Sequence, residues 1–293
     1  MILQCNGTSI GLDDGKGDIS FVSHAHADHL NGVKSKEEIL SSEETIELGG
    51  LKGKIKSLEN VKLLEAGHML GSRQLLVEND GKTTVYTGDL RLEDSILFKG
   101  AEIPQADEVI IEATYGDPSF EFPLNEEVYS QIKNWVKENS DKNLLIGGYE
   151  MGKSQELIAI LNKYCSVFPI VNERIAGLGE IYNKFGKKLE FIKVGTEEAE
   201  EEMKGPFVAV VPPKHAKRYF AKRIGDAFER KTLCAFASGW TLKYQYDVDA
   251  GFPLSDHASF SDLKKYIQES GAKKVSFFCG TTEFLKKDFK NLL

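Results

Sequence analysis

The stretch Ser23-His24-Ala25-His26-Ala27-Asp28-His29-Leu30 follows directly on an apolar run from Ile19 to Val22. It places three imidazoles and a carboxylate within six positions. Both side-chain types are ligands that suit Zn²⁺, Mn²⁺ or iron. A strand that ends in a tight loop can direct the first two histidines at one ion, while Asp28 and His29 face a second. Two neighbouring metals of this kind are typical of hydrolytic sites, so the stretch predicts a metal centre.

Two later residues extend this pattern. His68 lies in a turn bracketed by Gly67 and Gly71, and Asp89 ends an apolar strand that starts at Thr83. Taken alone, the first tract is also compatible with a His-rich surface segment that binds metal adventitiously. The chain has only six histidines, however, and a histidine and an aspartate at later strand ends favour one shared centre.

An HxHxDH loop, a glycine-flanked histidine and a strand ending in Gly-Asp, in this order, resemble the ligand set of the metallo-β-lactamase superfamily. The resemblance implies two Zn²⁺ ions, with Mn²⁺ as a possible substitute. It assigns Asp13 to a supporting position beside the histidines. The implied ligands are His24, His26 and His68 for one metal, Asp28 and His29 for the other, and Asp89 as a bridge between them.

A second set of motifs resembles the β-CASP branch of that superfamily, which contains nucleases acting on RNA and DNA. Glu112 ends an apolar strand and is followed by Ala-Thr-Tyr-Gly, and His257 lies in Ser-Asp-His-Ala-Ser. Gly152-Lys153-Ser154 and Ser238-Gly239-Trp240 resemble internal landmarks, although the family more often has Arg at position 153. The resemblance implies that Asp28 belongs to the catalytic metal site and that His257, oriented by Glu112, protonates the leaving oxygen. The alternative for this pair is an internal structural hydrogen bond.

These motifs together predict an α/β protein: a metallo-β-lactamase αββα sandwich with an inserted parallel α/β β-CASP domain. We expect the sandwich to comprise residues 1–118 and 251–293, and the insertion to comprise residues 119–250. The expected function is a metal-dependent nuclease that hydrolyses phosphodiester bonds of DNA or RNA, an exonuclease in nucleic-acid processing or repair. The resemblance is greatest to the short archaeal and bacterial exonucleases of the RNA-processing or ligase-associated type. The alternatives are a metallo-hydrolase of a small substrate, which would not need so long an insertion, and a non-catalytic binding subunit.

The chain departs from the β-CASP pattern at Cys279. RNA-cutting members have a His-Gly pair at this place, whereas the Artemis and Apollo group of DNA nucleases usually has Val. The Cys279 sulfur is either a replacement ligand for the second metal or a small packed side chain at a strand end. The number of metals and the preference for RNA or DNA both depend on this choice.

Composition sets broad limits. Of the 293 residues, 41% are hydrophobic and 28% charged, which is ordinary for a soluble globular protein. No apolar stretch approaches the length of a membrane span, and the four cysteines are scattered without a CxxC pair, so we expect a cytoplasmic location and reduced thiols. The net charge of -8 argues against a protein that coats nucleic acid through bulk electrostatics.

Positive charge is concentrated between Lys214 and Lys231, a segment that contains seven basic residues and only two acidic ones. Helical spacing puts several of them on one face. We therefore expect Lys214, Arg218 and Arg223 to bind substrate phosphates. A solvated helix surface is the alternative interpretation.

The run from Gly147 to Ser154 fits the P-loop pattern GxxxxGK[ST]. A nucleotide hydrolase also needs a later apolar strand that ends in a Mg²⁺-binding Asp, and no later strand here ends that way. We therefore discount nucleotide hydrolysis. A helix N-terminus can still hold a phosphate, so Lys153 and Ser154 are predicted to contact the backbone of the substrate.

Hydrophobic periodicity divides the chain in the same way. The first third consists of short strands and turns, including a predicted hairpin with an Asp80-Gly81 turn. From Glu126 onward, strands and helices alternate, which is typical of a parallel sheet. The buried strands expected there are 167–171, 190–194, 207–211 and 233–237.

Overall fold

The computed structural model describes residues 1–293, which fold into two compact units. The discontinuous unit comprises residues 1–121 and 256–293, and the inserted unit comprises residues 122–255. The first crossing between them therefore lies three residues beyond the predicted position and the second five residues beyond it. Segment 119–121 stays with the discontinuous unit because Phe260 N donates to Phe120 O, and Ser261 N donates to the Glu121 carboxylate.

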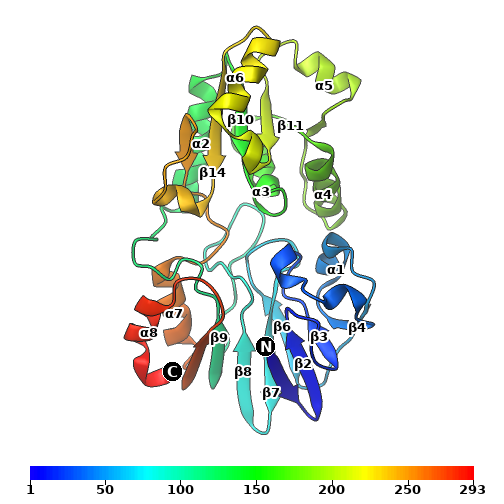
Figure 1. Cartoon of the computed structure of the whole chain (residues 1–293), viewed down its shortest axis with the longest axis vertical. Helices are drawn as coiled ribbons and strands as arrows, with labels where there is room; N and C mark the ends of the chain where they lie inside the picture. Colours follow the sequence, from blue (N-terminus) through cyan, green and yellow to red (C-terminus); the bar gives the residue numbers. More distant parts are fainter. The chain divides into compact units, whose positions relative to one another are not determined.

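Two five-stranded sheets form the discontinuous unit (Figure 1). The first sheet has the order β1 (Ile2–Cys5), β2 (Thr8–Leu12), β3 (Ile19–Phe21), β4 (Glu38–Leu40), β5 (Lys54–Ile55). The second has the order β16 (Lys274–Phe277), β9 (Glu108–Ile111), β8 (Lys82–Tyr86), β7 (Arg73–Asn79), β6 (Val61–Glu65). The predicted hairpin joins β7 to β8, and both turn residues have positive φ, 52° at Asp80 and 70° at Gly81, as a tight hairpin turn requires.

The two sheets pack face to face, and helices cover their outer faces. Alternation along β9 shows the arrangement: Ile110 belongs to the core between the sheets, whereas Val109 and Ile111 pack with the helices behind the second sheet. Those helices are α7 (Phe260–Glu269) and α8 (Glu283–Asp288), and the short helix η6 (Lys290–Leu292) follows them. On the first sheet, Val22 and Ile39 pack with η2 (Val33–Ser35) and α1 (Glu43–Gly49), which completes an αββα sandwich.

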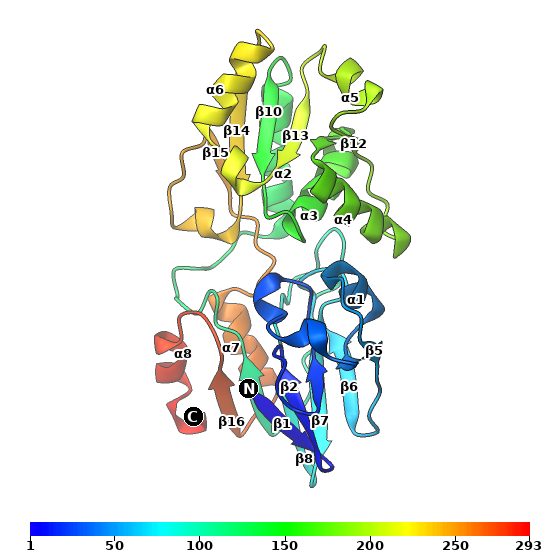
Figure 2. The ribbon, with the colours of Figure 1, turned by 45° about the vertical axis from the view of Figure 1, so that its right-hand side comes forward.

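A six-stranded, wholly parallel sheet forms the inserted unit (Figure 2). Its order is β12 (Ile192–Lys193), β11 (Ile170–Val171), β13 (Val208–Val211), β10 (Asn143–Gly147), β14 (Thr232–Ala237), β15 (Ala250–Phe252). Its helices are α2 (Asn125–Glu138), α3 (Lys153–Ile160), η3 (Leu161–Cys165, a π-turn), α4 (Glu173–Lys184), α5 (Glu197–Glu202), η4 (Pro213–His215), α6 (Arg218–Ala227) and η5 (Gly239–Leu242). The α/β fold class predicted from the sequence is therefore confirmed. No helix of the chain has the length and apolar character needed to cross a membrane.

Strand order fixes where the loops of the inserted sheet diverge. The chain leaves β10 through α3 toward β11, on one side of β10, but leaves β13 through α6 toward β14, on the other side. Right-handed crossovers then put α3 and α6 on opposite faces of the sheet, and Ala221 of α6 packs with Leu145 and Ala209 on its own face. The loops after β10 and β13 thus part from each other at the carboxyl edge of the sheet, which is a topological switch point.

The predicted phosphate contacts of Lys153 and Ser154 do not match the loop after β10. The Lys153 side chain is buried, and its ammonium forms an ion pair with Glu156, with 3.3 Å between Nζ and Oε2. Ser154 donates both its N–H and its hydroxyl to Tyr149 O. The Gln155 side chain accepts from Gly152 N, 2.8 Å away. Donors that a P-loop would offer to a phosphate are thus used inside the protein, so the phosphate interpretation of this motif was wrong.

Candidate metal centre

The HxHxDH residues occupy the loop that follows β3 and the short helix η1 (Ala27–His29). Pairing of β3 with its neighbours continues to Val22, whose N–H donates to Leu40 O. Strand pairing ends there, and the side chains of Ser23, His24 and Ala25 that follow are buried. His24 is fully buried and His29 nearly so, whereas the Asp28 side chain is 80% exposed.

Glycines allow the two later ligand residues to approach this loop. Gly88 precedes Asp89 and has φ 55°, and a Cβ on it would lie 2.5 Å from Ser23 Cβ. Gly67 precedes His68 and has φ 71°, and a Cβ there would lie 2.4 Å from Arg91 O. Any other residue would strain the backbone and push these segments apart. The glycine-flanked pattern in the sequence therefore has a steric cause.

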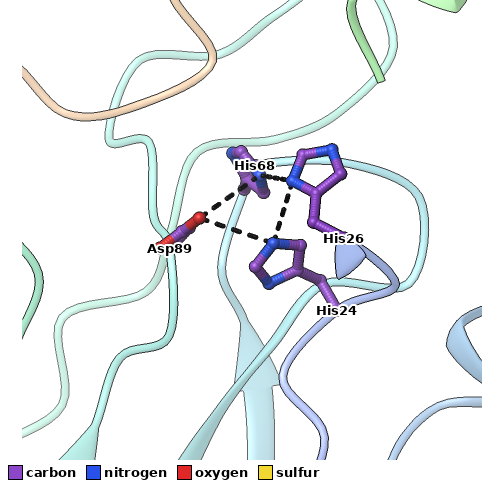
Figure 3. Close-up of side chains that lie close together, drawn as sticks. All are labelled: His24, His26, His68 and Asp89. Atoms are coloured by element: carbon purple, nitrogen blue, oxygen red, sulfur yellow. Dashed lines mark hydrogen bonds and ion pairs between the residues drawn. The ribbon is translucent and has the colours of Figure 1, made fainter. Parts of the chain in front are cut away.

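Three imidazoles and one carboxylate converge at the centre (Figure 3). His26 Nδ1 lies 3.0 Å from His24 Nε2 and 3.2 Å from His68 Nε2. Asp89 Oδ2 lies 3.4 Å from His24 Nε2 and 3.8 Å from His68 Nε2. The four ligand atoms lie within 4.8 Å of one another, so this group could hold a divalent metal ion.

The chemistry of these donors fits a metal. His68 Nδ1 lies 2.8 Å from Asp256 O and donates its proton to it, which leaves Nε2 of the neutral ring with a lone pair. Burial, and then the neighbouring histidines, hold the pKa of His24 and of His68 well below the usual range, and neutral imidazole is the form that binds metal. Burial and then the Glu112 carboxylate raise the pKa of the Asp89 carboxyl, because both disfavour its negative charge. A bound cation would stabilise that charge.

Asp13 connects the histidine loop to both sheets. It follows β2 in a left-handed backbone conformation, φ 50°, which Asp tolerates better than most residues. Its carboxylate accepts from Ser23 N and Ser23 Oγ, each at 2.6 Å, from His29 Nδ1 at 2.6 Å, and from Tyr86 OH at 2.8 Å. Ser23 Oγ in turn lies 3.0 Å from His24 Nδ1. Asp13 therefore fixes the orientation of two of the predicted ligands.

A second group of predicted ligands lies next to the first. Because Nδ1 of His29 donates to Asp13, its Nε2 is directed elsewhere, 3.5 Å from Asp89 Oδ2 and 3.7 Å from Asp28 Oδ2. Asp89 thus borders both groups. This is the position that a bridging carboxylate between two metals would occupy.

His257 and Glu112 form a buried pair beside these groups. His257 Nδ1 lies 2.9 Å from Glu112 Oε1, and Glu112 Oε1 also accepts from Leu90 N at 2.8 Å. The His257 ring is 4.6 Å from the ring of His68, centre to centre. Burial lowers the pKa of His257, but the Glu112 carboxylate outweighs burial and raises that pKa to about 10.

Cys279 lies two residues beyond the end of β16. Its sulfur, an Asp89 oxygen and a Glu112 oxygen lie within 4.8 Å of one another. Burial first, and then these two carboxylates, raise the pKa of the Cys279 thiol to about 12. The side chain is only partly buried.

The predicted phosphate-binding residues lie in the inserted unit, in the segment around α6. Arg218 Nε is 3.1 Å from Asp249 Oδ1, and Asp249 Oδ2 accepts from Cys234 N. Arg218 therefore holds the segment before β15 against β14, and its role as a phosphate ligand stays a prediction. Lys214 and Arg223 are exposed, and the Arg223 guanidinium lies 5.9 Å from the ring centre of Tyr219.

Sequence reasoning missed three residues of the centre. Ser23 and Tyr86 hold Asp13, and the Asp256 carbonyl orients His68. Ser23 and Asp256 stand next to predicted site residues, so adjacency was the available signal. Tyr86 had none, because a tyrosine on an apolar strand is ordinary in a core.

Comparisons with known proteins agree with this geometry. No family model matches the chain. It is 31% identical over 289 residues to a probable DNA ligase of Opitutus terrae, covering 90% of this chain and 27% of that one. It is also 31% identical over 159 residues to an RNase J-like protein of Methanocaldococcus jannaschii, covering 50% of this chain and 36% of that one. The chain belongs to the β-CASP branch of the metallo-β-lactamase superfamily.

A solved structure supports the fold of this β-CASP protein. A protein of unknown function from Enterococcus faecalis V583 has a TM-score of 0.62 and 14% identity, and the match covers 93% of this chain and 77% of that one. At this identity the likeness concerns the fold alone. The chain spans only about a quarter to a third of the two curated relatives, 27% and 36% of their lengths.

Asp13→Asn is expected to weaken metal binding by about 10- to 100-fold, because the amide nitrogen of Asn cannot accept the hydrogen bonds that Ser23, His29 and Tyr86 donate to the carboxylate. Competition with a coloured zinc chelator measures the affinity without any substrate. Asp14→Asn is the matched control, since the Asp14 carboxylate pairs with the N-terminus and not with a histidine. Equal zinc affinity in wild type and Asp13→Asn would contradict the orienting role.

Proposed function

We propose that this β-CASP protein is a metal-dependent nuclease that hydrolyses phosphodiester bonds. The observation that carries the proposal is the position of the Glu112–His257 pair directly beside the convergent group of His24, His26, His68 and Asp89. The convergent group offers ligands for a metal, and the Glu112–His257 pair offers a proton donor. The relatives named RNase J-like protein and probable DNA ligase belong to nucleic-acid metabolism, which favours a nucleic-acid substrate.

Different residues of the chain would bind metal, donate a proton and orient the ligands. Metal ions bound by the two groups would supply a nucleophile at neutral pH and positive charge for the developing phosphate charge. His257 would donate its Nε2 proton to the leaving oxygen, while Glu112 holds Nδ1 and so fixes the tautomer and raises the pKa. Asp13 and the Asp256 carbonyl keep the rings of His29 and His68 aimed at the centre.

DNA is the substrate that we propose as preferred, with exonucleolytic cleavage in repair as the process. The alignment with a probable DNA ligase extends over 90% of this chain, compared with 50% for the RNase J-like protein. Cys279 also replaces the histidine expected in RNA-cutting members. Two Zn²⁺ ions, replaceable by Mn²⁺, are the proposed cofactors.

Chelation should abolish cleavage, and Zn²⁺ or Mn²⁺ should restore it. His26→Ala should remove both metal and activity, because His26 Nδ1 lies between the other two ring nitrogens. The assay follows end-labelled single-stranded DNA and RNA of identical sequence. His215→Ala is the matched control, since His215 stacks on Phe220 in the inserted unit. Undiminished cleavage in the His26→Ala preparation would mean that a contaminant is responsible.

His257→Ala should slow cleavage by on the order of 10²-fold or more, the usual scale for general acid catalysis, while metal content stays at the wild-type level. Metal content is measured by elemental analysis of the same samples used for kinetics. Glu112→Gln should act in the same direction, since the amide no longer holds His257 in its charged form. Loss of metal from the His257→Ala protein would show that His257 is a ligand and not an acid.

Cys279→Val should keep both metal content and activity, because Asp28, His29 and Asp89 already border the second position and water can complete a metal shell. Cys279→His should also support full occupancy. Wild type and the Val, His and Ser variants of Cys279 are compared by elemental analysis and by the end-labelled DNA assay. If Cys279→Val and Cys279→Ser both fall toward one ion per chain, the sulfur is a ligand after all.

A further inference from the structure

Three exposed tyrosines gather at the carboxyl edge of the inserted sheet. Tyr149 lies in the loop after β10, and Tyr244 and Tyr246 lie in the segment between η5 and β15. Their exposed fractions are 48%, 51% and 41%. Exposure of three large rings in one region is unusual for a surface that only meets water, and it requires an explanation.

Two of the tyrosines share a buried support. Phe236, near the end of β14, lies 6.4 Å from the Tyr149 ring and 4.9 Å from the Tyr246 ring, centre to centre. The Tyr244 ring is 5.9 Å from that of Trp240. Tyr244 and Tyr246 also line one hollow of about 410 Å³ that borders β15. They form one aromatic surface carried by two loops.

Positive charge adjoins this surface. A hollow of about 330 Å³ is lined by Phe236 and Tyr246 together with Lys214 and Lys217 of the loop after β13. Both lysines are exposed, and neither forms an ion pair with a carboxylate. Asp247, the one carboxylate that lines the hollow, faces the Arg218 guanidinium at 3.9 Å. The lysine charges are therefore available to an anion.

The location agrees with the topology. Tyr149 comes from the loop after β10, and the two lysines come from the loop after β13, so they lie on the loops that part at the switch point. Gly147 allows the loops to meet, because a Cβ on it would lie 2.2 Å from Ala216 Cβ. Crevices at such points are where parallel α/β sheets commonly bind ligands.

We propose that Tyr149, Tyr244 and Tyr246, with Lys214 and Lys217, bind single-stranded nucleic acid, with bases stacked on the rings and phosphates beside the lysines. The proposal rests on the proposed nuclease function and adds where a strand is held. A single strand is a chain of flat bases joined by phosphates, so its bases can stack on the tyrosine rings while its phosphates lie beside the lysines. Stacking of this kind does not depend on which base is present. Bases of a duplex are already stacked inside it, so the surface selects single strands.

The test measures binding of a fluorescent oligothymidylate by anisotropy, with the full chain loaded with metal and carrying His257→Ala to slow cleavage. Tyr244→Leu/Tyr246→Leu should weaken binding by about 10-fold or more, because one stacked base contributes that much. Tyr244→Phe/Tyr246→Phe should bind as the parent does, since the rings remain and only the hydroxyls are lost. An abasic strand of equal length should bind the parent and the leucine variant alike.

The lysines are tested by the salt dependence of the same binding. Lys214→Gln/Lys217→Gln should reduce the log-log slope by roughly 0.7 for each lost phosphate contact. Matched controls are Tyr219→Leu, an exposed tyrosine on α6, and Lys188→Gln, an exposed lysine that precedes β12 at the opposite edge of the sheet. Both controls should bind as the parent does, and thermal unfolding checks that every variant is folded.

Failure of this proposal is distinguishable from failure of the nuclease function. If wild type cleaves but the leucine variant binds oligothymidylate as tightly as the phenylalanine variant, the surface proposal is overturned and the nuclease function stands. Equal loss in the leucine and phenylalanine variants would also overturn it, because hydroxyls and not rings would then hold the strand. If the parent binds with the expected dependence on the rings but wild type with metal never cleaves, the surface is supported and the nuclease function fails.

Discussion

Asp13 lies where the two sheets of the discontinuous unit meet, and its carboxylate accepts hydrogen bonds from both. Ser23 and His29 belong to the loop after β3 in the first sheet, while Tyr86 belongs to β8 in the second. A buried carboxylate is costly unless it is fully bonded, so these donors and the acceptor stabilise one another. The packing of the sandwich and the aim of the histidines thus depend on one side chain. The left-handed backbone of Asp13 is the local cost of that arrangement.

Charge balance explains why the rest of the centre takes its form. Asp89 and Glu112 are buried carboxylates, and different neighbouring groups surround each of them. Glu112 is held by His257 and by backbone N–H groups, which stabilise its charge and lower its pKa despite burial. Asp89 lies among ring nitrogens of His24, His29 and His68. Two of these rings are driven toward the neutral form, so a cation is the natural partner for Asp89. Glu112 is therefore paired with His257, whereas Asp89 is left to bind a metal.

Much of the centre could be predicted because its ligands follow short-range rules. Strand ends and glycines are visible in a sequence, and they place His24, His68 and Asp89 at one edge of the sandwich. The failures share a different cause. Lys153 matched a P-loop by letters, but the pattern does not record that Tyr149 O and Gln155 use the donors of the loop. Charge counting predicted Arg218 as a phosphate ligand and could not show that a carboxylate far along the chain, Asp249, pairs with it. Partners distant in sequence decide whether a polar group is available, and composition does not contain them.

This difference between local and distant information also accounts for the aromatic surface of the inserted unit. No motif predicts an aromatic surface made of Tyr149, Tyr244 and Tyr246, which come from two loops separated by about a third of the chain. They meet because β10 and β14 are neighbours in the sheet and end at the same edge. Likewise, the lysines of the loop after β13 reach that edge only because β13 pairs with β10 on its other side. Strand order, set by which apolar strands pack together, converts unremarkable residues into a coherent surface. A change in strand order would disperse it while leaving every local pattern intact.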